Sequence, residues 1–264
     1  GPTGIEMAGA IGEMAIHTLV DDFTHINTAD AKIYLIEGLD RVLPGYPENL
    51  STKARQALEN LGIEIMTGTM VTDVEKEKIT ISRAKKDSLI NTQTVIWAAG
   101  TQASSLGKNI AEKTGSHTDK QGRLFVNKHC QIEKFPGIFV IGDLAHFEDM
   151  KKQVLPGVAQ VAIQQGKYVA ETIVKQMQQK EIKPFHYSDR GNMAVIGRKA
   201  AVAHIGKIKF SGFTAWLLWL FIHLMYLVGF QNKLLVIIQW AYNYFTRNSS
   251  ARIIANYKNI SQNS

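Results

Sequence analysis

The sequence opens with GPTGIEMAGAIGEMA (residues 1–15), in which two glycines stand three positions apart at the start of an apolar helical pattern. In dinucleotide-binding folds, a glycine-rich turn before a helix lets backbone N–H groups approach a pyrophosphate, and the helix dipole favours the anion. Gly1 and Gly4 have the spacing of the second and third glycines in G-x-G-x-x-G. The stretch predicts such a turn, although a glycine pair before a helix is also found in ordinary turns.

Downstream of this turn, helix and strand patterns alternate as in a doubly wound sheet. The apolar stripe predicts a helix to about Val20, followed by a buried parallel strand in AKIYLIEG (31–38). A second helix is expected in STKARQALENLG (51–62), with Ser51 as its N-cap. Further strands are expected at 63–68, 70–82, 92–100 and 137–143, with a small antiparallel piece near residues 69–83. A long helix is expected at 156–177 and a linker at 178–191.

The strand at 31–38 ends in a carboxylate, Glu37. In a dinucleotide fold this position accepts hydrogen bonds from the adenosine ribose hydroxyls, although the spacing from the glycine turn is longer here than the usual ~20 residues. A carboxylate at this position would repel a 2′-phosphate and would therefore select the unphosphorylated ribose. The alternative is an ordinary solvated strand end.

Composition and charge narrow the function classes. The only cysteine, Cys130, excludes an internal disulfide and a redox-active cysteine pair within these residues. No histidine is followed by glutamate and no C-x-x-C occurs, so we expect no metal site. The net charge of +7 comes from the end of the chain, because residues 191–264 hold eight Lys and Arg and no Asp or Glu. Such a basic segment fits a nucleic acid or an anionic membrane surface, and its apolar content favours the membrane.

Five stretches carry a family resemblance: TVIWAAGT (94–101), GIFVIGDLA (137–145), LPGVAQVAIQQGKYVA (155–170), MAVIGRKAAV (193–202) and the apolar ending WLLWLFIHLMYLVGFQNKLLVIIQWAYNYFTRNSSARII (216–254). Over essentially its whole length the sequence resembles the type II NADH:quinone oxidoreductases, which are two-dinucleotide-domain flavoproteins. The ending is the most specific part. The residues lack the N-terminal half of the family's FAD domain with its first G-x-G-x-x-G. We therefore expect a C-terminal fragment that, alone, neither retains FAD tightly nor turns over.

The resemblance implies an α/β fold with a Rossmann-like NADH-binding domain at 1–100, the C-terminal part of an FAD-binding domain at 101–182, and an amphipathic helical membrane-binding tail at 183–264. The cofactor-binding residues that it implies for NADH and FAD are Gly1, Gly4, Glu37, Ala99, Gly100, Gly142, Asp143 and Ala159. It further implies that Glu6 and Gln160 are catalytic, and that Gln160 and Gln164 meet the quinone. Each has an ordinary alternative: a first-turn helix carboxylate for Glu6, a turn cap for Asp143, an exposed helix amide for Gln160.

The activity implied is oxidation of NADH through FAD with electron transfer to a membrane quinone, without proton pumping, at the cytoplasmic face of the inner (plasma) membrane. A homodimer is left open, and no nucleic-acid partner is expected. Two other hypotheses stay open: an NAD(P)H-dependent flavoprotein reductase of another acceptor, such as a ferredoxin, and a non-catalytic membrane-associated dinucleotide-binding protein. A flavin spectrum bleached by NADH would separate the enzymes from the last of these.

The apolar ending predicts membrane attachment. Residues 210–232 form an uncharged segment that is long enough for a transmembrane span. Aromatic residues recur at helical spacing instead, with Trp216, Trp219 and Trp240 expected at headgroup depth. The flanking cations are Lys207, Lys209, Lys233, Arg247 and Arg252. We therefore expect helices lying in the membrane surface, with a single span as the alternative.

Overall fold

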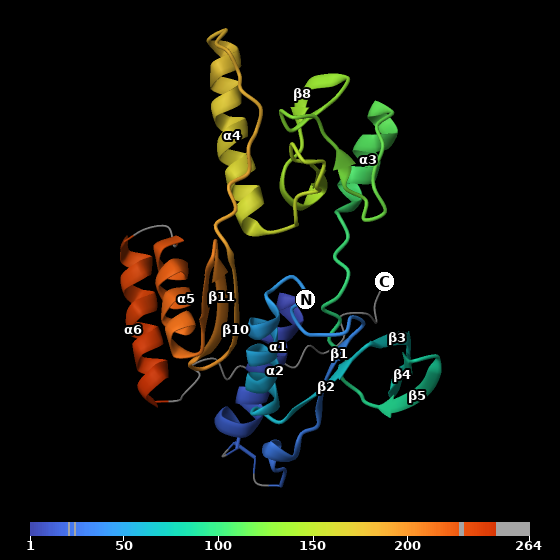
Figure 1. Cartoon of the computed structure of the whole chain (residues 1–264), viewed down its shortest axis with the longest axis vertical. Coiled ribbons are helices and arrows are strands. Elements are labelled where there is room, and N and C mark those ends of the chain that lie inside the picture. Colours follow the sequence, from blue (N-terminus) through green and yellow to red (C-terminus); the bar gives the residue numbers. More distant parts are fainter. Residues whose placement is uncertain (21, 24, 227–229, 247–264) are drawn as a thin grey trace, which may run out of the picture. The chain divides into compact units, whose positions relative to one another are not determined.

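The structure, a computed structural model of the chain, describes residues 1–20, 22–23, 25–226 and 230–246 (Figure 1). They form two compact units. The first comprises Gly1–Trp97 together with the described residues from Asn192 onward, and the second comprises Ala98–Gly191. The segment after residue 191 therefore packs with the first 97 residues.

The first unit begins with the helix predicted from the opening glycines. Helix α1 (Pro2–Glu13) continues into a π-helical turn, Met14–Thr18. Strand β1 (Ile33–Glu37) pairs in parallel with β2 (Ile63–Thr67), and α2 (Glu48–Glu59) connects them. This is the expected helix, strand, helix, strand order.

The predicted N-cap of α2 is wrong. Helix α2 begins at Glu48 with Pro47 as its N-cap, so Ser51 lies inside the helix and is buried. The Ser51 hydroxyl donates to the carbonyl of Val42 instead. A proline that already holds an extended backbone before an acidic first turn places the N-cap four residues earlier, at Pro47.

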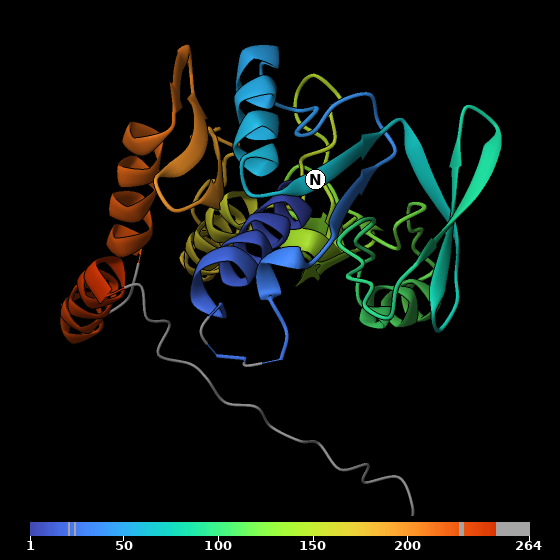
Figure 2. The same cartoon turned by 90° about the horizontal axis from the view of Figure 1, so that it is seen from below.

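Two antiparallel sheets complete the strands of this unit. Strands β3 (Thr69–Val74), β4 (Lys78–Arg83) and β5 (Lys86–Asn91) form one sheet, which includes the expected antiparallel pair and a third strand that was not predicted. The other is made by β10 (Asn192–Gly197), β11 (Ala200–Ile205) and β12 (Ile208–Ser211). Helices α5 (Phe213–Tyr226) and α6 (Phe230–Thr246) follow and contact each other; they are the orange and red helices at the left of Figure 2.

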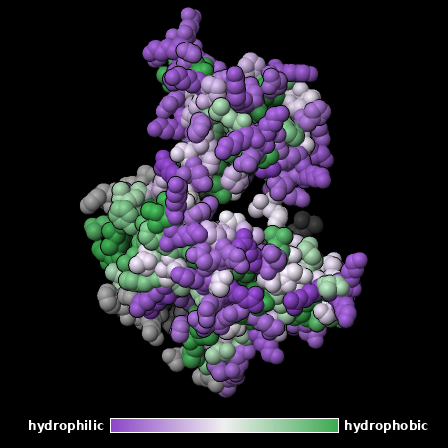
Figure 3. All heavy atoms as spheres, viewed as in Figure 1, coloured by the Kyte–Doolittle hydropathy of each residue, from purple (hydrophilic) through white to green (hydrophobic). Residues whose placement is uncertain are grey.

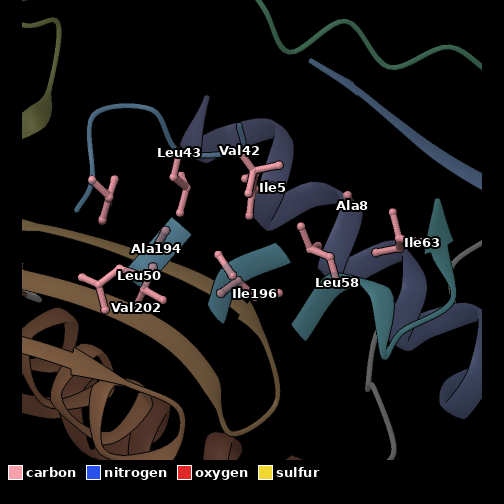
Figure 4. Close-up of a cluster of buried hydrophobic side chains, with 12 residues drawn as sticks. Ile5, Ala8, Val42, Leu43, Leu50, Leu58, Ile63, Ala194, Ile196 and Val202 are labelled. Atoms are coloured by element: carbon pink, nitrogen blue, oxygen red, sulfur yellow. The ribbon is translucent and has the colours of Figure 1, made fainter. Parts of the chain in front are cut away.

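The core of the first unit joins segments far apart in the sequence. Figure 4 shows side chains of α1 and α2 meeting those of β10 and β11. The fully buried members with large side chains are Ile5, Leu43, Leu50, Leu58 and Ile196. Burying such aliphatic side chains stabilises a fold by roughly 1.5–3 kcal/mol each. The C-terminal sheet is therefore a structural part of the unit that carries the glycine turn.

The second unit is built around helix α4 (Ala159–Met177) and short strands. Helix α3 (Ser105–Thr114) is followed by β6 (Leu124–Phe125), β7 (Gln131–Ile132), β8 (Phe135–Phe139) and β9 (Ala145–His146). Strands β6 and β9 pair in parallel, while β7 and β8 pair antiparallel. The long helix was predicted. The strand expected at 137–143 lies at Phe135–Phe139 instead, where Phe135 and Phe139 pair with β7.

One sequence expectation fails for a backbone reason. Residues 92–100 form no strand; the N–H of Thr92 donates to the carbonyl of Glu77, but no sheet of the described residues includes this segment. An apolar run becomes a strand only where a neighbour supplies ladder hydrogen bonds. The expected linker at 178–191 forms no helix or strand. It is held against α4, because Phe185 is buried and the Tyr168 hydroxyl of α4 donates to the carbonyl of Lys183.

Candidate functional site

The N-terminus of α1 lies beside the carboxylate predicted to bind a ribose. Gly1 is the N-cap without a side-chain cap, and Gly4 lies in the first turn. The Gly1 nitrogen is 3.3 Å from Glu37 Oε2, while Glu37 Oε1 accepts from the N–H of Leu39 at 3.1 Å. The first N–H groups of a helix have no intrahelical acceptor, so they are available to an anion. A pyrophosphate at this turn would therefore place its ribose within reach of Glu37, which fits a dinucleotide.

A third glycine holds the helix in this position. A Cβ added to Gly9 would lie 1.6 Å from the carbonyl oxygen of Ile196 in β10. Only glycine allows the helix backbone to approach the strand so closely. Dinucleotide-binding folds use one glycine for close packing of the helix against a strand. Here Gly9 has this role, and its partner is the C-terminal sheet. The sequence analysis did not identify it.

The predicted catalytic carboxylate and the predicted membrane tryptophans line one cavity of about 890 Å³. Glu6 and Glu13 of α1 and residues of β10 form one wall, and apolar side chains of α5 and α6 form the other. The tryptophans that line it are Trp216, Trp219 and Trp240. The Trp219 and Trp240 rings stack at 6.1 Å. Cavities of roughly 300–1,000 Å³ with apolar walls and few polar groups are typical of small-molecule sites.

Burial raises the pKa of Glu6 above its usual value. The hydrogen bond that Oε1 accepts from the N–H of Val195, at 3.1 Å, and the charge of His223 offset part of this rise. Burial also raises the pKa of the neighbouring Tyr46 to about 12, with a smaller contribution from Glu6. Glu6 is therefore a carboxyl group that holds its proton more tightly than an exposed one, at the wall of an apolar cavity.

The second unit carries a smaller, polar cavity of about 310 Å³ around Asp143. Thr101, Gln102 and Ala103, which follow Ala99 and Gly100, line it together with Gly157. Thus the two stretches TVIWAAGT and GIFVIGDLA meet at one cavity.

Glycine is required on two sides of Asp143. Gly142 has a φ of +64°, and a Cβ there would also lie 3.2 Å from the Cβ of Ala162. A Cβ on Gly157 would lie 3.2 Å from Asp143 Oδ1. No hydrogen bond reaches the Asp143 carboxylate from the described part of the chain. A free carboxylate in a polar cavity fits the hydroxyl groups of a polyol, such as the ribityl chain of FAD.

Arg123 is the one cation that lines this cavity, and a rigid loop holds it. Asp119 Oδ2 accepts from Arg123 Nε at 2.7 Å and lies 2.8 Å from His146 Nδ1, while Oδ1 accepts the N–H groups of Gln121 and Arg123. Although burial acts to raise the pKa of Asp119, these bonds hold it well below its usual range. No local sequence pattern identifies this cluster.

Both glutamines predicted at the quinone fasten α4 to the segment after it. Gln160 Nε2 donates to the carbonyl of Gly191 at 2.7 Å, and its Oε1 accepts from the N–H of Arg190 at 3.2 Å. Gln164 exchanges two hydrogen bonds with the backbone of Ser188, at 2.9 and 3.0 Å. Ala159 is the first residue of α4. The predicted roles of these residues toward a quinone stay predictions.

Large apolar side chains of α5 and α6 are exposed (Figure 3), and some of them also line the cavity beside Glu6. They are Phe213, Leu217, Phe221, Met225, Leu234, Leu235, Ile237 and Ile238. The three tryptophans are only half-exposed, so aliphatic and phenylalanine side chains form most of this surface. Arg247 and Arg252 lie outside the described residues. None of the helices within the described ranges is both long and apolar enough to cross a bilayer.

Cys130 is a buried free thiol, and burial raises its pKa to about 12. It is therefore neither a disulfide partner nor a nucleophilic thiolate.

The glycine turn with its acidic strand end and the polar cavity at Asp143 are features of a dinucleotide-binding protein of the α/β class. The family model described as "Pyridine nucleotide-disulphide oxidoreductase" matches residues 1–166. The model described as "NDH2 C-terminal domain" matches residues 190–248. The chain belongs to the pyridine nucleotide-disulphide oxidoreductase family, in its type II NADH:quinone oxidoreductase (NDH2) branch.

Known relatives support this placement. The type II NADH:quinone oxidoreductase Ndh of Mycobacterium tuberculosis is 42% identical over 254 residues, which cover 93% of this chain and 53% of the relative. NdhA of the same organism is 40% identical, covering 94% and 53%. The chain thus spans about half the length of these relatives. The fold matches NDH2 from Plasmodium falciparum in complex with NADH, with a TM-score of 0.84 at 17% identity, over 94% of this chain and 65% of that one.

Proposed function

We propose that the protein to which this chain belongs oxidises NADH through bound FAD and passes the electrons to a membrane quinone without pumping protons. In this proposal residues 1–100 bind NADH, residues 101–182 complete the flavin site, and residues 183–264 attach the protein to the membrane. The observation that carries it is the position of Glu37 at the uncapped N-terminus of α1. The M. tuberculosis relatives named above, which bear the same activity in their names, add support.

On the NADH side, groups of this chain would bind the nucleotide and select NADH over NADPH. The N–H groups at Gly1 and Gly4 would bind the pyrophosphate, and Glu37 would accept from both ribose hydroxyls. A 2′-phosphate would meet the Glu37 carboxylate as a like charge, which favours NADH over NADPH. Glu6 would take up a proton more readily than an exposed carboxylate, because burial raises its pKa.

On the flavin side, Asp143 would accept from the ribityl hydroxyls, and the loop at Ala99–Gly100 would lie against the cofactor. When bound, FAD would supply the two-electron redox chemistry that amino-acid side chains lack. The chain's contribution is to fix the cofactor's position through Gly142, Asp143 and the wall at 101–103.

On the quinone side, the amides of Gln160 and Gln164 have donors to spare. Each Nε2 carries two N–H groups, and only one per side chain is used by the carbonyls of Gly191 and Ser188. The second N–H can donate to a quinone carbonyl without changing its protonation state. The fastened backbone at 188–191 would keep both amides oriented for this contact.

At the membrane, the apolar surface of α5 and α6 would enter the headgroup region, with Lys207, Lys209 and Lys233 attracting anionic lipid at about 1 kcal/mol each. Attachment would be to the cytoplasmic face of the inner (plasma) membrane, where quinone is dissolved.

Steady-state oxidation of NADH by the purified full-length protein tests the proposal. We expect rapid turnover with a quinone in detergent or vesicles, and little with a ferredoxin. Turnover that requires the ferredoxin would favour the other acceptor class, and a protein that binds nucleotide without oxidising it would overturn the enzyme assignment.

A further inference from the structure

One buried polar side chain of α4 has no part in the function proposed so far. Gln165 is fully buried, at 0% exposure, on the same helix face as Val161 and Thr172, which are also buried. Its Oε1 accepts from the N–H of Gly142 at 2.7 Å. Its Nε2 is buried and has no hydrogen-bond partner in the described part of the chain.

The bond to Gly142 is directional. A backbone N–H can only donate, so the side chain facing it must present an acceptor at that point. A bond of 2.7 Å between two buried groups is short for an N–H donor, and removing the acceptor would leave the N–H buried and unsatisfied.

Gly142 begins the turn that presents Asp143. Its φ of +64° and the 3.2 Å approach of a Cβ to Ala162 leave this turn little freedom. On the other side, Gly157 approaches the Asp143 carboxylate. Helix α4 therefore determines where Asp143 lies, and Gln165 supplies the one hydrogen bond from α4 to the Gly142 N–H.

We propose that Gln165 is a positioning residue, which fixes the Gly142–Asp143 turn through its Oε1 and thereby sets how tightly the protein holds its flavin. The inference rests on the proposed function, in which Asp143 meets the ribityl chain. Because Nε2 makes no bond, only the acceptor half of the amide is needed.

Two nearly isosteric substitutions separate acceptor from size. Gln165→Glu keeps an acceptor facing Gly142 in either protonation state, whereas Gln165→Met keeps the volume without it. Thr172→Val is the matched control, because Thr172 is 2% exposed on the same helix face and lies about two turns further along α4 than Gln165. Gln165→Leu is the second acceptor-free variant should the methionine variant not fold.

The full-length protein is titrated with FAD after removal of its flavin, and the visible circular dichroism of bound FAD and the melting temperature are recorded. We expect Gln165→Met to raise the FAD dissociation constant by about tenfold or more and to change the flavin dichroism. Gln165→Glu should stay within about threefold of wild type, and Thr172→Val should change only the melting temperature.

FAD binding by Gln165→Met equal to wild type would overturn the inference and leave the proposed function standing. Equal weakening by Thr172→Val, or failure of Gln165→Glu to restore binding, would show a general packing effect and overturn it too. A wild-type protein that binds no FAD would overturn both this inference and the proposed function.

Discussion

In the proposed function Glu37 selects the nucleotide by its charge, since its carboxylate lies at the end of β1 beside Gly1. Replacing it by glutamine keeps hydrogen-bond capacity and removes the repulsion of a 2′-phosphate. We expect Glu37→Gln to shift the ratio of kcat/KM for NADH over NADPH toward NADPH by about tenfold or more. An unchanged ratio would show that Glu37 does not contact the ribose. Glu64→Gln, on exposed β2 surface, is the control that should leave the ratio unaltered.

Glu6, at the wall of the apolar cavity, makes the stability of the folded chain depend on pH. Burial raises its pKa above 4.5 in the folded chain, so the folded state binds this proton more tightly than the unfolded state. The associated stability is fully present below about pH 4.5 and is lost as pH rises through the raised pKa.

Glu6→Gln removes this titration while keeping an acceptor for the N–H of Val195. The variant should melt higher than wild type at about pH 8, and the difference should shrink toward about pH 4. Thermal melting across this range measures it. A difference that does not depend on pH would mean that Glu6 titrates normally.

At the scale of elements, α1 is fixed to β10 by the absence of a side chain at Gly9. Gly9→Ala places a methyl group on the carbonyl of Ile196, so helix and strand must separate. We expect the free energy of unfolding to fall by at least about 2 kcal/mol, measured by denaturant titration. Gly166→Ala, in α4, meets only Ile141 at 3.8 Å and should be neutral or stabilising by about 0.5–1 kcal/mol. Equal stability of the two variants would contradict the close packing.

Elements with strong local patterns could be predicted from the sequence, and those that depend on distant partners could not. The periodicities of α1 and α4 and the apolar run of β1 indicated these elements correctly. Residues 92–100 have the composition of a strand but belong to no sheet of the described residues. Ser51 looked like an N-cap because it precedes an apolar pattern, yet Pro47 starts the helix.

The same division holds for the candidate site. The glycine turn, Glu37 and the Gly142–Asp143 pair have recognisable local patterns. Gln165 and Gly9 matter through residues that are far away in sequence, Gly142 and Ile196. A signal for Gln165 did exist: it interrupts the apolar stripe of α4, where a polar residue must find a buried partner. Nothing local pointed to the cavity that joins Glu6 to the tryptophans.

At the scale of the whole molecule, the exposed apolar surface of α5 and α6 should determine where the protein resides. Phe221 and Ile238 are 61% and 58% exposed, one on each helix. Replacing both by glutamate should lower binding to anionic lipid vesicles by about tenfold or more, because the apolar area and the positive character of the surface both decrease.

Leu89→Glu is the matched control for this prediction. Leu89 is 60% exposed on β5, away from these helices in the same unit. It should leave vesicle binding unchanged. Vesicle sedimentation of the full-length protein gives the comparison, and membrane binding equal to wild type in the double variant would assign attachment to other residues.

The central claim is that electrons pass from NADH through a flavin to a quinone. Stopped-flow absorbance of the full-length protein under anaerobic conditions tests it most directly, because each half-reaction is seen separately. We expect NADH to bleach the flavin band within one turnover and a quinone added afterwards to restore it. A band that NADH leaves unbleached, or that a quinone does not restore, would contradict the claim.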